Sequence, residues 1–360
     1  MARICLNMIV KNEAAVMSRC LESVRPWIDH WVIVDTGSTD GTQKLVRELM
    51  HDVPGSLHER PWHDFAHNRN EALMLARDHG DYLLFIDADE TLDMPDGFGW
   101  PDLNDEAYQF LCELNGWRYL RNALVSTRRA WRWEGVLHEY LTCDQPHKWQ
   151  KLPGPTIVVA HDGARGRNPD TYLHDVEVLE EALRREPGNS RYRFYLAQSY
   201  RDAGKPEAAL YQYRARLSMG GWDEECWFCL FQIAVLSERL AMPPREVCAS
   251  YLAAYQARPR RAEPLCELAR YHRLRGEYAL AHVYAQQAAA IAMPADSLFV
   301  DGAVYAWRAR DELAISAFYV GAFAQGKEVL LRMLHDQEFP DDQRVRLEQN
   351  LQCYLIREEA

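Results

Sequence analysis

The sequence lacks a long uninterrupted apolar run. None of its stretches approaches the roughly 18 apolar residues that a membrane-spanning helix needs. The moderately apolar start at residues 1–10 is interrupted by Lys11, Asn12 and Glu13, which is too soon for the apolar region of a secretory signal. We therefore expect neither a membrane span nor a secretory signal.

The chain also lacks an excess of positive charge and a regular cysteine framework. Its formal net charge is -12, whereas a constitutive nucleic-acid binder usually carries a basic face. Nucleic acid is therefore a less expected partner, although a local basic groove stays open. The nine cysteines are an odd number scattered over the chain, which fits reduced thiols in the cytoplasm better than disulfides. Cys226 and Cys229 form a lone C-x-x-C without further zinc ligands nearby, so we expect them to pack between helices.

The first half of the chain alternates strand and helix patterns. With 48% hydrophobic and 26% charged residues, the composition is that of a globular protein. Strands are expected at residues 3–10, 31–34 and 82–86, and helices at residues 14–23, 42–50 and 67–79. This order predicts a mostly parallel sheet covered by helices. Further strands at residues 131–141 and 156–160 would close a domain that we place at residues 1–168.

The second half has a helical repeat pattern. Ala197 and Ala269 lie 72 residues apart, close to two periods of about 34 to 36 residues, and Gly204 and Gly276 follow them in the same register. A copy near residues 233–234 lacks the turn glycine. The pattern resembles tetratricopeptide repeats, whose paired helices stack into a concave surface. We assign residues 169–360 to this helical domain, with a last hairpin at residues 311–334 and a closing helix at residues 344–356.

Carboxylates follow two of the expected strands. Asp35 and Asp87 come at the carboxyl ends of their strands, where ligands of such sheets bind. Asp87 and Asp89 form a D-A-D motif whose oxygens suit Mg²⁺ or Mn²⁺. Such an ion could bridge a diphosphate and offset the charge that develops as a nucleotide leaves. The alternative is a solvated acidic loop, since Glu90 and Asp93 follow.

Four motifs occur in a characteristic order. They are L-N-M-I-V-K-N-E at residues 6–13, V-I-V-D-T-G-S-T-D-G-T at 32–42, W-H-D-F-A-H-N-R-N at 62–70 and Y-L-L-F-I-D-A-D-E at 82–90. Together they resemble the family 2 glycosyltransferases over roughly residues 1 to 165. The resemblance implies an α/β, Rossmann-like nucleotide-sugar-binding domain of the GT-A fold, followed here by the all-α helical repeats. It also implies an inverting transfer from a nucleotide-diphosphate sugar, most simply a UDP-sugar.

The resemblance assigns roles in donor binding. Asp35 would accept a hydrogen bond from the nucleotide base, and Asn12 and Glu13 would lie near the ribose and base. The alternative for Asn12 and Glu13 is a helix N-cap region. Arg69 could reach the diphosphate, because a guanidinium fork matches phosphate oxygens. Asp64, before the same helix, could cap it or meet the donor.

The resemblance also implies a metal site for Mn²⁺ or Mg²⁺. Asp89 would be the direct ligand, while Asp87 would hold the ribose or a metal-bound water, or bind the ion itself. His161 follows an expected strand and suits a third ligand, because enzymes of this fold often take one from a histidine near the end of the domain. The alternative is an ordinary histidine at a strand end.

A catalytic base is expected in the stretch R-R-A-W-R-W-E-G-V-L-H-E-Y-L at residues 128–141, which is similar to the W-x-G-x-x-H-E of repeat-bearing family members. An inverting transferase needs a base for the proton of the attacking acceptor. We assign this role to Glu139, with Glu134 as second candidate. His138 would orient Glu139 or contact the diphosphate. A buried His–Glu pair with a structural role is the alternative.

The acceptor is the least constrained part of the prediction. The sequence has no Q-x-x-R-W motif, which processive synthases carry, so transfer of a single sugar to a discrete acceptor is favoured. That acceptor could be a glycan, a peptide or protein, or a small molecule, and the repeats could hold a partner or dimerise the enzyme. Two other functions stay open: a nucleotidyltransferase, disfavoured because no glycine-rich basic loop follows the first strand, and a non-catalytic scaffold.

Overall fold

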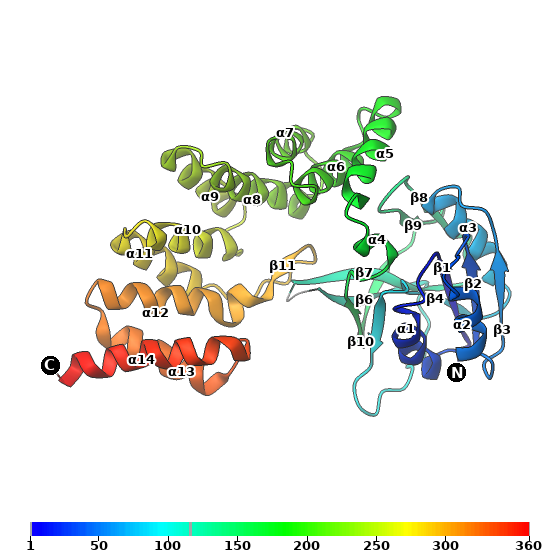
Figure 1. The fold of residues 1–360 in the computed structure, drawn as a ribbon, viewed down its shortest axis with the longest axis horizontal. Coiled ribbons are helices and arrows are strands. Elements are labelled where there is room, and N and C mark those ends of the chain that lie inside the picture. Colours follow the sequence, from blue (N-terminus) through cyan, green and yellow to red (C-terminus); the bar gives the residue numbers. More distant parts are fainter. Residues whose placement is uncertain (1, 115–116, 360) are drawn as a thin grey trace. The chain divides into compact units, whose positions relative to one another are not determined.

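A computed structural model describes residues 2–114 and 117–359. The chain forms two compact units, which are coloured along the sequence in Figure 1. The first unit contains residues 1–115 and 119–204, and the second contains residues 116–118 and 205–360. Over the described part of the chain, no helix is both long and apolar enough to cross a membrane.

The first unit begins with a parallel sheet, in agreement with the prediction. Its strands are β1 (Ile4–Val10), β2 (His30–Asp35), β3 (Gly55–Glu59) and β4 (Tyr82–Phe85), in the order β3-β2-β1-β4. They alternate with the helices α1 (Met17–Val24), α2 (Thr42–Leu49) and α3 (Phe65–Ala76), and the short 3-10 helix η1 (Arg25–Trp27) follows α1. Because the strands are parallel, the segments that follow β1, β2 and β4 leave the same edge of the sheet.

The sheet continues with antiparallel and mixed pairing. Next to β4 come β7 (Trp117–Ser126), β6 (Ala107–Leu114), β10 (Trp149–Val159) and β5 (Glu90–Asp93). The single strand predicted at residues 131–141 is wrong. The structure has a separate hairpin of β8 (Arg132–Glu134) and β9 (Tyr140–Thr142) there. Gly135 and His138 between them have φ values of 115° and 51°, and this left-handed backbone cannot continue a strand.

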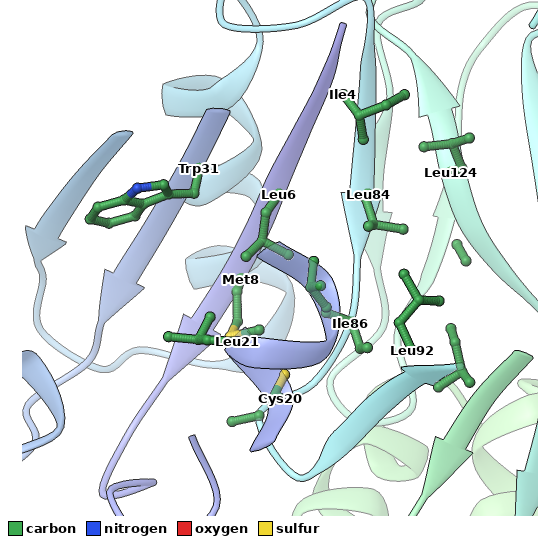
Figure 2. Packing of buried hydrophobic residues seen from close by; sticks show 14 of the residues in the cluster. Ile4, Leu6, Met8, Cys20, Leu21, Trp31, Leu84, Ile86, Leu92 and Leu124 are labelled. Atoms are coloured by element: carbon green, nitrogen blue, oxygen red, sulfur yellow. The ribbon is translucent and has the colours of Figure 1, made fainter. Parts of the chain in front are cut away.

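The parallel strands are buried on both faces, which explains their continuous apolar runs. Leu6, Met8 and Leu84 face α1, where Leu21 and Cys20 pack on them, as Figure 2 shows. The alternate residues of these strands, among them Cys5, Leu83 and Phe85, face a second cluster on the opposite side. Their polar groups are therefore left to the strand ends and loops.

The remaining helices form successive hairpins, as predicted (Figure 1). Those after the sheet in the first unit are α4 (Ala164–Arg167), α5 (Thr171–Arg185) and α6 (Ser190–Asp202). The second unit contains α7 (Pro206–Leu217), α8 (Asp223–Arg239), α9 (Pro244–Ala257), α10 (Glu263–Leu274), α11 (Tyr278–Ala289), α12 (Ala309–Tyr319), α13 (Phe323–Asp336) and α14 (Arg344–Glu359). It also has a short strand β11 (Val300–Asp301) and the single turns η2 (Val304–Arg308) and η3 (Asp341–Gln343). The predicted fold class, an α/β domain followed by helical repeats, is confirmed.

The turn glycines of the repeats have the backbone conformation that the pattern requires. Gly204 after α6 and Gly276 after α10 have φ values of 70° and 73°. In the degenerate copy, Ala241 after α8 takes a φ of 49° instead. A residue with a Cβ is rare in this conformation, so the helical ending is kept at a local energetic cost.

The first helical hairpin packs with the sheet domain. Leu137, between β8 and β9, lies in one buried cluster with Val176 and Leu179 of α5 and Leu196 of α6. The compact units accordingly divide after Gly204. The domain boundary at residue 168, which marks where the strand signal ends in the sequence, stays a prediction.

We predict that Gly55→Ala destabilises the first unit by about 1–3 kcal/mol, because it overpacks a filled site. Gly55 pairs with Trp31 across β2 and β3, and a Cβ on Gly55 would lie 2.3 Å from the indole ring of Trp31 (labelled in Figure 2). The matched control is Gly188→Ala, whose Cβ would meet nothing within 4 Å. Urea unfolding followed by circular dichroism should separate the two variants. Equal unfolding midpoints would show that the Trp31 side chain moves aside without a cost in stability.

Candidate active site

The loop after β1 is tied to the turn after β2. Asn12 has a φ of 58°, its Oδ1 accepts a hydrogen bond from the Thr39 amide at 2.8 Å, and its own amide donates to Ser38 Oγ at 2.8 Å. Both predicted donor-binding segments are therefore held side by side. The Asn12 side chain is engaged in fixing this turn.

Asp35, at the end of β2, has one fixed and one unpaired carboxylate oxygen. Oδ1 accepts hydrogen bonds from the amides of Gly37 at 3.0 Å and Ser38 at 2.8 Å, and from Gln43 Nε2 at 3.0 Å. The residue is only 1% exposed, and its Oδ2 is buried without a hydrogen-bond partner among the described residues. Burying a polar atom without a hydrogen-bond partner costs about 1–3 kcal/mol of folding free energy. This oxygen is therefore a ready acceptor for a ligand N–H group.

Glu13 connects the first strand to the loop after β10. Its carboxylate oxygens accept from the Ala164 amide at 3.0 and 3.2 Å, and its own amide donates to Thr42 Oγ1 at 2.9 Å. Burial, with a further contribution from the nearby Asp89 carboxylate, raises the pKa of Glu13 to about 7. Glu13 thus closes one side of the site through a contact between segments 151 residues apart.

Arg69 on α3 binds two other predicted site residues, Asp87 and Glu139. The guanidinium donates to Asp87 Oδ1 at 2.6 Å and to Glu139 Oε1, and it lies over the Trp133 ring at 5.0 Å. Its side chain is 13% exposed. Burial alone would lower the pKa of Arg69, but the carboxylates of Asp87 and Glu139 raise it above its ordinary value. Arg69 therefore stays charged and holds both carboxylates.

A second arginine reaches the same carboxylate. Arg121 on β7 lies 3.8 Å from Asp87 and makes two hydrogen bonds, at 2.6 and 2.5 Å, to the buried Glu90. Burial alone would raise the pKa of Asp87, but Arg69 and Arg121 hold it below its ordinary value. Sequence reasoning missed Arg121, and it considered Glu90 only in the alternative of a solvated acidic loop. Ala88 and Leu92, two positions to either side of Glu90, were a signal of its burial.

The two carboxylates of the D-A-D motif diverge. Asp89 Oδ2 accepts from the Gly163 amide at 3.3 Å, and the Asp89 carbonyl accepts from Arg19 Nη2 at 3.0 Å. Arg19 also pairs with Asp162, with one contact at 2.6 Å. Asp89 therefore faces the loop after β10, whereas Asp87 faces the arginines.

The three expected metal ligands are not assembled into one cluster. Among residues 2–114 and 117–359, no three His, Cys, Asp or Glu side chains lie close enough together to hold a metal ion. His161 follows β10 with a φ of 56° and is exposed. The carboxylate oxygens of Asp87 and Asp89 fit Mg²⁺ or Mn²⁺ in kind, but the number of protein ligands falls short unless donor phosphates add theirs. The metal site stays a prediction.

The remaining predicted residues have local partners. The His138 ring stacks on Tyr195 of α6 with centroids 3.8 Å apart, while Glu139 turns toward Arg69. Displacement of water from the ring, which stacks on Tyr195, and the charges of Arg165 and Arg191 lower the pKa of His138, although part of the residue is exposed. Asp64 caps α3 by accepting from the His67 amide at 2.7 Å, so the capping alternative is the one that the structure has.

Comparisons with known proteins found a matching family model, relatives and similar solved structures. The sequence model described as glycosyl transferase family 2 matches residues 5–96. A TPR repeat-containing protein of Synechococcus elongatus is 30% identical, covering 45% of this chain and 43% of its own length. An uncharacterized glycosyltransferase of Rickettsia felis is 25% identical over 63% of this chain and 80% of its own. The glycosyltransferase SunS of Bacillus phage SPbeta is 25% identical over 58% of this chain and 51% of its own.

The chain thus spans between 43% and 80% of the length of these relatives. Among solved structures, MamA is 13% identical with a TM-score of 0.38, covering 47% of this chain and 90% of that protein. A tetratricopeptide repeat protein from Parabacteroides merdae is 18% identical with a TM-score of 0.39, covering 52% of this chain and 66% of that protein.

We predict that Arg69→Met lowers the unfolding free energy of the first unit by about 3 kcal/mol, because it leaves the Glu139 carboxylate without this partner and Asp87 with only the more distant Arg121. Arg77→Met, at the exposed end of the same helix, should change it by less than about 0.5 kcal/mol. Urea unfolding of both variants measures the difference. If the two variants are equally stable, the ion pairs contribute nothing to the fold.

Proposed function

We propose that this chain, whose residues 5–96 match the sequence model of the family 2 glycosyltransferases, is an inverting glycosyltransferase that moves one sugar from a nucleotide-diphosphate sugar to a discrete acceptor. The observation that carries the proposal is the buried, unpaired Oδ2 of Asp35 at the ligand-binding edge of the sheet. Uracil and thymine present an imide N–H that can donate to this oxygen. Cytosine presents an acceptor nitrogen at the same position, so a UDP- or dTDP-sugar suits the site better.

The arginines supply the charge that a diphosphate needs. Arg69 and Arg121 both face Asp87, and the positive charge of Arg165 also lowers the pKa of Asp87. Guanidinium groups hydrogen-bond phosphate oxygens in a fork geometry and cannot lose their charge at physiological pH. These side chains would hold the diphosphate and stabilise it as it leaves.

A divalent cation, Mn²⁺ or Mg²⁺, would add Lewis-acid stabilisation of the leaving nucleoside diphosphate when it is bound. We assign Asp89 as its direct ligand, with Asp87 and His161 as further candidates. The support is chemical, since carboxylate oxygens are the ligands these ions prefer. Among the described residues, the Asp89 carboxylate accepts one long hydrogen bond, at 3.3 Å, so it is available to a ligand.

Glu139 is the proposed base for the acceptor hydroxyl. Its side chain is 9% exposed and is fixed by Arg69, the same residue that holds Asp87 beside the donor. A carboxylate held in one position by a guanidinium can accept a proton in a defined direction. Glu134, on the same hairpin, is bound by Arg132 at 2.7 Å and by Tyr140 Oη at 2.8 Å, and is the second candidate.

We predict that calorimetry finds UDP or dTDP binding stronger than CDP binding, and stronger with Mn²⁺ than without it. Asp35→Asn should weaken binding about 10-fold or more, because it replaces a charged acceptor for the base N–H. Asp89→Ala should remove the Mn²⁺ dependence. Asp93→Ala, an exposed carboxylate on β5, is the matched control and should bind as the wild type does.

Absence of nucleotide binding by the folded wild-type protein would argue for the scaffold function. Full Mn²⁺-dependent binding by Asp89→Ala would remove Asp89 from the metal site. A GDP preference would redirect the donor assignment without affecting the reaction class.

We predict that Glu139→Gln keeps the UDP affinity within about 2-fold but slows release of UDP from a UDP-sugar, with water as acceptor, by about 100-fold or more, because only the proton acceptor is lost. A coupled assay for UDP release measures the rate. Glu134→Gln is the parallel variant and should stay near the wild-type rate. The opposite pattern would assign the base to Glu134, and loss of UDP affinity in Glu139→Gln would give Glu139 a donor-binding role.

A further inference from the structure

A hollow of about 550 Å³ lies in the first unit beside Glu139 and outside the donor cluster. It is enclosed by the start of α3, the β8–β9 hairpin and the turn between α5 and α6. Its chemically distinctive lining residues are Trp133, Glu134, Tyr140, Glu186, Arg191 and Tyr192. This volume is within the range of small-ligand sites. We propose that this hollow, which we name the hairpin pocket, binds the acceptor and that the acceptor is a saccharide; the inference rests on the proposed function.

One side chain separates the hairpin pocket from the reactive cluster. Trp133 lines the pocket, and the Arg69 guanidinium, which binds Glu139, lies over the Trp133 ring. Asn70, next to Arg69 on α3, fixes the backbone of Trp133 with hydrogen bonds of 2.8 and 2.9 Å. Tyr140 in the pocket directly follows Glu139 in the chain. An occupant of the pocket would therefore lie close to the proposed base.

The lining combines aromatic surface with hydrogen-bond acceptors. Tyr140 is 40% exposed, and its hydroxyl donates to Glu134 at 2.8 Å. Glu186, exposed at the α5–α6 turn, accepts from Asn189 at 2.9 Å and has further lone pairs available. A sugar ring fits such a site, because its C–H face packs on an aromatic ring while its hydroxyls donate to carboxylates.

Other ligand classes suit the lining less well. Two carboxylates, Glu134 and Glu186, disfavour a phosphorylated or acidic ligand. The Arg191 guanidinium is engaged with the His138 carbonyl at 2.8 Å and lies over the Tyr140 ring at 5.1 Å. Ala66 is the only aliphatic side chain among the described lining residues, so the walls offer aromatic rings and polar groups and almost no aliphatic surface.

The α5–α6 region contributes four of the nine described lining residues of the hairpin pocket. Glu186 lies just after α5, and Arg191 and Tyr192 belong to α6, which packs through Leu137 against the β8–β9 hairpin. Gly135 in that hairpin has a φ of 115°, and a Cβ there would lie 3.3 Å from the Glu139 Cα. The turn that positions Glu139 therefore also shapes the pocket. The β8–β9 hairpin thus supplies both the proposed base and part of the proposed acceptor site.

Saturation-transfer NMR with a panel of methyl glycosides of common hexoses, N-acetylhexosamines and deoxyhexoses tests the inference on the full chain. At least one glycoside should receive saturation from the wild-type protein. Tyr140→Ala should reduce its affinity about 10-fold, and Glu186→Gln should reduce it several-fold. Tyr211→Ala, which removes a 68% exposed tyrosine from α7, is the matched control and should leave the affinity unchanged.

UDP calorimetry on the same samples separates the two proposals and reports folding of each variant. Unchanged UDP binding with loss of glycoside binding in Tyr140→Ala supports the hairpin pocket. Glycoside binding that depends on Tyr140 in a protein that binds no nucleotide would overturn the transferase function and keep a saccharide site. No saturation of any glycoside by a wild-type protein that binds UDP, or equal losses in Tyr140→Ala and Tyr211→Ala, would overturn the inference.

Discussion

The position of the Arg69 guanidinium is the constraint on which the rest of the site depends. It joins α3, the end of β4 and the β8–β9 hairpin through Asp87 and Glu139, two residues 52 positions apart in the chain. The guanidinium and the two carboxylates stabilise one another in this partly buried site, because burying any one of these ions without a partner would be costly in free energy. The ring of Trp133 supports the guanidinium from one side. This arrangement places a donor-side carboxylate and the proposed base at a fixed separation.

The polar chemistry is confined to the strand ends because both faces of the parallel sheet are filled. Every residue of β4 is buried, and the alternating side chains of β1 enter two different apolar clusters. Asp35 and Asp87 therefore emerge where the backbone leaves the sheet and where amides of the turns are available. At Asp35 those amides satisfy one oxygen only, which leaves the other as a directional acceptor.

The sequence predicts the parallel strands β1, β2 and β4 and their functional ends, because a two-sided core gives continuous apolar runs and the acidic residues mark their ends. It does not predict the parallel strand β3, which has no fully buried residue. It does not predict Arg121 either, because the strand β7 that carries it was not assigned from the sequence. The strand expected at residues 131–141 fails because φ is positive at Gly135 and His138, and His138 has no sequence signal for that conformation. Likewise, Ala241 takes the left-handed turn conformation that the repeat pattern assigns to glycine.

Arg69 also couples the two halves of the proposed reaction. A diphosphate beside Asp87 would compete with that carboxylate for the guanidinium, and any shift of Arg69 changes its hydrogen bond to Glu139. Donor binding beside Asp87 would therefore be felt at the position of the proposed base. Lysine could not reproduce this link, since it lacks the fork that contacts two carboxylates from one planar group. The same guanidinium thus ties the position of Glu139 to the group that occupies the donor side of the site.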